Sequence, residues 1–159
     1  RFTSGVSVVV ATFAGRVDPM TTAVPEGPRM RILVVDDDAM FRRGLRSMLE
    51  SAGFSICEAP GGHAAVGIVR SEAPDVVLSD LYMPEGDGLE LLHFVRVNRP
   101  GVRVIMMSGG SRLGTFDLLP AAKDLGASAV LAKPLRRESL LSTLGQLLHH
   151  SHCEQGELN

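Results

Sequence analysis

The chain has 159 residues and 45% hydrophobic content, which suits one domain with one packed core. The formal net charge is −2 and tryptophan is absent, so the basic excess and aromatic platforms of nucleic-acid-binding domains are missing. No apolar run reaches the roughly 18 residues that a membrane span needs. We therefore expect neither nucleic acid nor a membrane as a direct partner.

The two cysteines, Cys57 and Cys153, do not form a disulfide framework, which fits a reducing, cytoplasmic compartment. Residues 16–29 are rich in Pro, Thr and Gly and are typical of a linker. The sequence thus predicts three parts. They are a disordered extension at residues 1–29, a folded domain at 30–150 and a polar tail at 151–159.

From Met30 onward, short apolar runs alternate with stretches whose apolar residues recur at helical spacing. The predicted strands span residues 31–36, 54–59, 76–80, 102–107 and 128–132. Predicted helices follow them, with apolar stripes that start near Ala39, Ala64, Leu89, Phe116 and Arg136. Asp38 is expected to cap the first helix and Gly53 to end it. Pro120 is tolerable in the fourth helix only near its first turn.

Apolar strands joined by helical crossovers predict an α/β fold, a doubly wound, five-stranded parallel sheet covered on both faces. The right-handed crossover rule leaves few strand orders. We expect the flavodoxin-like order 2-1-3-4-5. In such sheets, ligands bind at the carboxyl ends of the strands, beside the point where the strand order reverses.

Polar side chains occupy the predicted strand ends. Asp36 and Asp37 end the first strand, Asp80 the third, and Ser108 and Lys133 follow the fourth and fifth. Crowded carboxylates repel one another, and Mg²⁺, which prefers oxygen ligands, relieves the repulsion. Lysine and serine side chains could then hold phosphate oxygens. The third-strand carboxylate would be left as a nucleophile of the kind that forms aspartyl phosphates.

Simpler interpretations exist for each residue taken alone. The acidic run 36–38 could be a helix N-terminal cluster favoured by the helix dipole, and Lys133 could be a surface lysine. The combination of these residues at neighbouring strand ends favours a site. The His and Cys residues of 149–153 could bind a metal, but adjacent helix positions do not face one way, so a frayed tail is preferred.

Four motifs resemble those of response-regulator receiver domains. Residues 32–38 (ILVVDDD) resemble the opening strand of that family. Residues 75–84 (DVVLSDLYMP), followed by Asp87-Gly88, resemble its phosphoacceptor strand and loop. Ser108 matches its switch hydroxyl, and residues 126–134 resemble its last strand and lysine. The resemblance covers about residues 30–150.

The resemblance implies a role for each acid. Asp80 would accept a phosphoryl group from the phosphohistidine of a sensor histidine kinase or a histidine phosphotransfer protein. Asp37 and Asp80 would bind Mg²⁺ directly, together with the backbone carbonyl of Tyr82. Asp36 would act on the metal largely through water.

The resemblance also implies roles at the last two strand ends. Lys133 would pair with a phosphoryl oxygen, and the peptide bond before Pro134 would be cis. Ser108 would move toward the phosphate and shift the loop and helix after it. Val130 stands where receivers often carry Tyr or Phe, three residues before the lysine. We therefore expect output through backbone or helix movement and not through an aromatic rotamer switch.

Three functions are open to a chain with these residues. The favoured one is a stand-alone phosphoacceptor switch that signals through an unidentified output protein and is not an enzyme, apart from catalysing its own phosphorylation and dephosphorylation. An alternative is a receiver-like docking module that is not phosphorylated. A third is a small aspartyl-phosphate phosphohydrolase, which needs an acid two residues after Asp80, where this chain has Tyr82.

Overall fold

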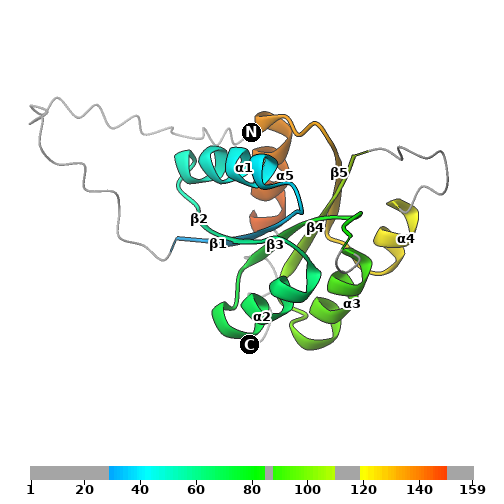
Figure 1. The fold of residues 1–159 in the computed structure, drawn as a ribbon. Helices are drawn as coiled ribbons and strands as arrows, with labels where there is room; N and C mark the ends of the chain where they lie inside the picture. The colour runs from blue at the N-terminus through cyan, green and yellow to red at the C-terminus, as the bar shows by residue number, and fades with distance from the viewer. Residues whose placement is uncertain (1–28, 85–87, 110–118, 150–159) are drawn as a thin grey trace, which may run out of the picture.

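The computed structural model describes residues 29–84, 88–109 and 119–149 (Figure 1). Apart from Arg29, the predicted N-terminal extension lies outside these residues, as does the predicted tail at 151–159. Of the His and Cys residues near the C-terminus, only the backbone of His149 is described.

The described residues form a five-stranded sheet with the strand order β2-β1-β3-β4-β5, in which every neighbouring pair is parallel. The strands are β1 (Arg31–Val35), β2 (Ser55–Ala59), β3 (Val76–Asp80), β4 (Arg103–Ser108) and β5 (Ala129–Ala132). The helices are α1 (Ala39–Ser51), α2 (Gly62–Glu72), α3 (Gly88–Asn98), α4 (Leu119–Asp124) and α5 (Arg137–His149). The predicted fold and strand order are confirmed.

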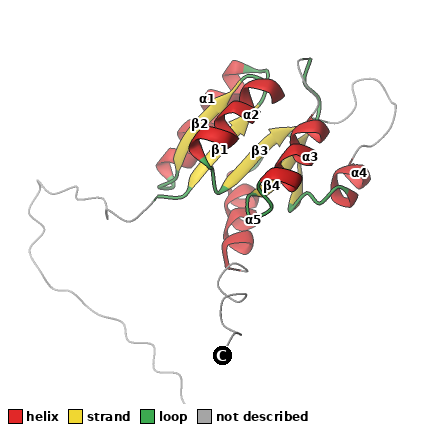
Figure 2. Ribbon diagram, turned by 90° about the horizontal axis from the view of Figure 1, so that it is seen from below, coloured by secondary structure: helices red, strands yellow, loops and turns green. Residues whose placement is uncertain are grey.

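Helices cover both faces of the sheet. Figures 1 and 2 show α1 and α5 on one face and α2, α3 and α4 on the other. In β1, Ile32 and Val34 pack in the core beneath α1 and α5, whereas Leu33 and Val35 pack in the core beneath α2, α3 and α4. Successive strand side chains point to opposite faces, so a central strand buried on both faces must be apolar along its length.

The start of α1 follows the predicted capping pattern. Asp38 is the N-cap, and its Oδ1 accepts hydrogen bonds from the backbone N–H groups of Met40 at 2.8 Å and Phe41 at 3.2 Å. After the helix, Gly53 has a φ of 94°, a left-handed conformation that suits glycine. These two residues fix where α1 begins and ends beside β1.

Element boundaries differ from the sequence expectation by small amounts. Strand β4 spans Arg103–Ser108, one residue later at both ends than the predicted 102–107. The predicted fourth helix at 116–125 is described only as α4 from Leu119 onward, which includes Pro120. Residues 116–118 lie outside the described residues, so the expected place of Pro120 in the first turn stays a prediction. Among the described residues, no helix combines the length and apolar character needed to cross a bilayer.

Candidate functional site

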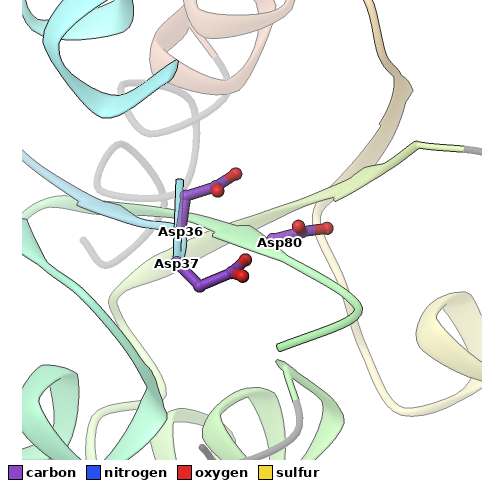
Figure 3. A group of neighbouring side chains, drawn as sticks. All are labelled: Asp36, Asp37 and Asp80. Carbon is purple, nitrogen blue, oxygen red and sulfur yellow. The ribbon is translucent and has the colours of Figure 1, made fainter. Parts of the chain in front are cut away.

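Three carboxylates meet at the carboxyl ends of β1 and β3. Because Val35 pairs with Ser79 in the parallel register, Asp36 and Asp37 leave β1 at the level where β3 ends in Asp80. Carboxylate oxygens of these three aspartates lie within 4.8 Å of one another. Figure 3 shows their carboxyl groups extending toward the same side of the strand ends. Three oxygen donors at this spacing suit a hard divalent cation.

Asp36 is the most enclosed of the three acids, with only 1% of its surface exposed. Its Oδ1 accepts from the backbone N–H of Asp38 at 2.8 Å, and its Oδ2 accepts from Lys133 Nζ at 2.5 Å. Burial raises the pKa of Asp36 above its usual range, and these hydrogen bonds offset the effect only in part. Both oxygens of this carboxylate are therefore already engaged within the protein.

Lys133 connects two of the carboxylates. Its Nζ lies 2.5 Å from Asp36 Oδ2 and 2.9 Å from Asp80 Oδ2. Burial lowers the pKa of the Lys133 ammonium, but the hydrogen bonds to the two carboxylates outweigh burial and leave that pKa above its usual range. The Lys133–Pro134 peptide bond is cis, as predicted.

Ser108 and Lys133 are joined through the backbone. The N–H of Lys133 donates to the carbonyl oxygen of Ser108 at 2.7 Å, at the carboxyl ends of β4 and β5. Ser108 is buried and is the last residue of β4, next to the residue that pairs with Asp80. Val130, the predicted departure from an aromatic, is half-buried against the core beneath α2, α3 and α4.

A pocket opens beside the acids. It has a volume of about 460 Å³ and is lined by Asp37, Leu81, Tyr82, Met83 and Pro84. Tyr82 is 41% exposed, and its backbone N–H lies 3.4 Å from Asp80 Oδ1. The predicted metal contact of the Tyr82 carbonyl stays a prediction, although Tyr82 and Asp37 line the same pocket. Asp37 is thus exposed at this pocket, whereas Asp80 is buried next to the lining residue Leu81.

Two further residues shape the site. Arg42 was not singled out from the sequence, and Gly88 was named only as part of the Asp87-Gly88 motif. Arg42 on α1 donates from its guanidinium to the carbonyl oxygen of Asp36 at 2.5 Å. A Cβ on Gly88 would lie 2.2 Å from the carbonyl oxygen of Asp80. Their positions beside the strand ends could have pointed to both residues. Arg42 lies in the first turns of α1, and Gly88 begins α3 beside the end of β3.

Comparison with known proteins identifies the family. The family model described as the response regulator receiver domain matches residues 32–145, which is most of the chain. The chain belongs to the response regulator receiver domain family. Receiver domains are phosphoryl-accepting signalling domains of two-component systems. They bind Mg²⁺ at an acidic pocket and interact with histidine kinases and output domains.

Individual relatives agree with this receiver assignment. The chain is 33% identical over 127 residues to response regulator MprA of Mycolicibacterium vanbaalenii, covering 80% of this chain and 54% of MprA. It therefore spans about half the length of that relative. It is 36% identical over 104 residues to sporulation initiation phosphotransferase F of Bacillus subtilis, covering 65% of this chain and 82% of that protein.

A solved structure gives the same result for the fold. The CheY-like response regulator receiver domain protein of Methanospirillum hungatei superposes with a TM-score of 0.73 and 28% sequence identity. The match covers 79% of this chain and 98% of that one. The receiver fold therefore accounts for the part of the chain from β1 through α5.

Gly88 offers a test of the packing at the site. We expect Gly88→Ala to destabilise the receiver by about 1–3 kcal/mol, because its methyl group would overlap the Asp80 carbonyl and force the backbone to shift. Gly67→Ala is the matched control, since a Cβ there meets nothing within 4 Å and Ala favours a helix by about 0.5–1 kcal/mol. Urea unfolding of both variants measures the difference. Equal stability of the two would contradict the described backbone contact.

Proposed function

We propose that this receiver is a phosphorylation switch whose acceptor is Asp80. The observation that carries the proposal is the placement of Lys133 Nζ, 2.9 Å from a carboxylate oxygen of Asp80, at the edge of a three-aspartate cluster. A nucleophilic carboxylate, oxygen donors for a metal and a fixed positive charge are the parts that phosphoryl transfer to an aspartate requires.

The acidic cluster fits Mg²⁺ as the cofactor. Asp37 and Asp80 would bind the ion directly, with the backbone carbonyl of Tyr82 as a third protein ligand. Asp36 would act through water, which is supported by the engagement of both its oxygens with Asp38 N–H and Lys133 Nζ. A bound Mg²⁺ supplies positive charge that neutralises the acids and the phosphoryl oxygens.

The proposed donor is the phosphohistidine of a sensor histidine kinase or a histidine phosphotransfer protein. An oxygen of the Asp80 carboxylate forms a bond to phosphorus while the bond from phosphorus to the histidine nitrogen breaks. The histidine leaves with the bonding electrons and takes up a proton from solvent. The Lys133 ammonium exchanges the carboxylate oxygen for a phosphoryl oxygen, and Ser108 donates its hydroxyl to another.

Output would run through the ends of β4 and β5 to an unidentified partner protein. Movement of Ser108 toward the phosphate would pull on the carbonyl that accepts from the Lys133 N–H, and so shift both strand ends together. Val130 supplies no aromatic rotamer switch, so the backbone is the proposed carrier. The similarity to sporulation initiation phosphotransferase F supports relay of the phosphoryl group to a further phosphotransfer protein as an alternative output.

The two competing functions have weaker support. A phosphohydrolase needs an acid two residues after the nucleophile, and this chain has the half-exposed Tyr82 there, a residue that lines the pocket. A docking module that is never phosphorylated would have no need for Lys133 between two buried carboxylates. Burying these charges costs desolvation free energy, and a functional role explains why the protein keeps them there.

Acceptance of phosphate at Asp80 is tested by intact mass spectrometry after incubation with acetyl phosphate. We expect a phosphoryl adduct on the wild-type chain when Mg²⁺ is present, and none when the metal is chelated. Asp80→Asn should show no adduct under either condition, because the nucleophilic oxygen is lost while the side-chain shape is kept. An equal adduct on Asp80→Asn would place the acceptor elsewhere, and no adduct on wild type would favour the docking module.

Tyr82 is proposed to shield the acyl phosphate from water, since this bulky residue lines the pocket together with Asp37 and follows Asp80 by two positions. We expect Tyr82→Ala to lose its phosphoryl group several times faster than wild type, and Tyr82→Phe to stay close to wild type because it keeps the bulk. Decay of the adduct after removal of acetyl phosphate measures both rates. A Tyr82→Ala half-life equal to that of wild type would count against shielding.

A further inference from the structure

The ammonium of Lys133 has an aromatic partner in addition to its two carboxylates. Its Nζ lies 4.3 Å from the centroid of the Phe41 ring. An ammonium group within about 6 Å of a ring centroid is attracted by the electron density of the ring face. Only 18% of the Lys133 side chain is exposed, so solvent weakens this attraction less than at an open surface.

We propose that Phe41 is a positioning residue for phosphoryl transfer, whose ring keeps the Lys133 ammonium at the acceptor while it changes hydrogen-bond partners. The inference rests on the proposed function of Asp80 as the phosphoacceptor. It adds a second residue of α1, after Arg42, to a site whose charged and hydroxyl groups lie at the strand ends. Phe41 touches no reacting atom and acts through Lys133.

The ring is held independently of the site. Phe41 is the third residue of α1, and its backbone N–H donates to the N-cap carboxylate of Asp38 at 3.2 Å. Its half-buried side chain packs against the core beneath α1 and α5. The capped helix and the core therefore fix the ring, whatever occupies the pocket.

The chemistry explains why such a support is useful. Lys133 donates to Asp36 and Asp80, and phosphorylation would remove the negative charge from the Asp80 carboxyl oxygens. At that moment Asp36, 2.5 Å away, would draw the ammonium toward the interior. A ring face attracts the charge without accepting one of its three N–H donors in a directed bond. It can therefore hold the ammonium in place and leave those donors available for a phosphoryl oxygen.

The chain contains a matched control for this contact. Phe94 on α3 is also half-buried, but it packs against the core on the opposite face of the sheet. Its ring lies under a different cation, the guanidinium of Arg70, with 5.1 Å from Cζ to the centroid. Phe94→Leu therefore removes an aromatic ring of similar burial and a cation–π contact without touching Lys133.

The kinetic test compares initial rates of phosphorylation by acetyl phosphate at saturating Mg²⁺. We expect Phe41→Leu to be slower than wild type by about two- to fivefold, the range that corresponds to one partly exposed cation–π contact. Phe41→Met, which keeps apolar volume without a ring, should match it. Phe41→Tyr should restore the rate, and Phe94→Leu should leave it unchanged. A wild-type rate in Phe41→Leu, or a Phe41→Tyr variant as slow as Phe41→Leu, would overturn the inference.

A second readout separates this inference from the function on which it rests. In the metal-free protein, the ε-methylene protons of Lys133 should show a ring-current NMR shift in wild type and Phe41→Tyr that Phe41→Leu loses. This shift reports the contact whether or not Asp80 is phosphorylated. If wild type takes a phosphoryl group but shows no shift, the inference alone is overturned. If wild type shows the shift but takes no phosphoryl group, the proposed function is overturned, although the contact exists.

Discussion

The hydrogen bonds of Lys133 to Asp36 and Asp80 are the interaction on which the site depends. They join residues that are 97 and 53 positions apart in the sequence. Lys133 follows β5 at the edge of the sheet, whereas Asp36 follows β1, with β3 and β4 between them. The contact therefore requires the whole strand order and the alignment of four strand ends. Any change of register would take one partner out of reach.

The site is also a problem of charge balance. Three carboxylates within 4.8 Å repel one another, and one ammonium compensates only part of that charge. Burial adds to the cost, as the raised pKa of Asp36 indicates. The surplus negative charge attracts a cation. A bound cation and the Lys133 ammonium would together attract a group that carries negative oxygens. This charge imbalance suits a receiver that responds to phosphorylation, because the added phosphoryl group changes what each charged side chain contacts.

The sequence was sufficient for most of the fold and for the charged centre. Apolar strands with helical stripes predicted the sheet and its order, and Asp38 and Gly53 marked the ends of α1. Strand ends pointed to Asp36, Asp37, Asp80 and Lys133. The support of these residues could not be predicted, because it depends on three-dimensional packing. Phe41 belongs to the apolar stripe of α1, and only the structure shows its ring beneath the Lys133 ammonium.

The most direct test of the account is ¹⁹F NMR of the wild-type chain with beryllofluoride, a mimic of the phosphoryl group. The account predicts bound fluorine resonances, distinct from those of free beryllofluoride, that require Mg²⁺ and are absent from Asp80→Asn. A Lys133→Ala variant should weaken binding and move the resonance of the fluorine that the ammonium contacts. Only free beryllofluoride with wild type at saturating Mg²⁺ would contradict the claim that these residues form a phosphoryl site.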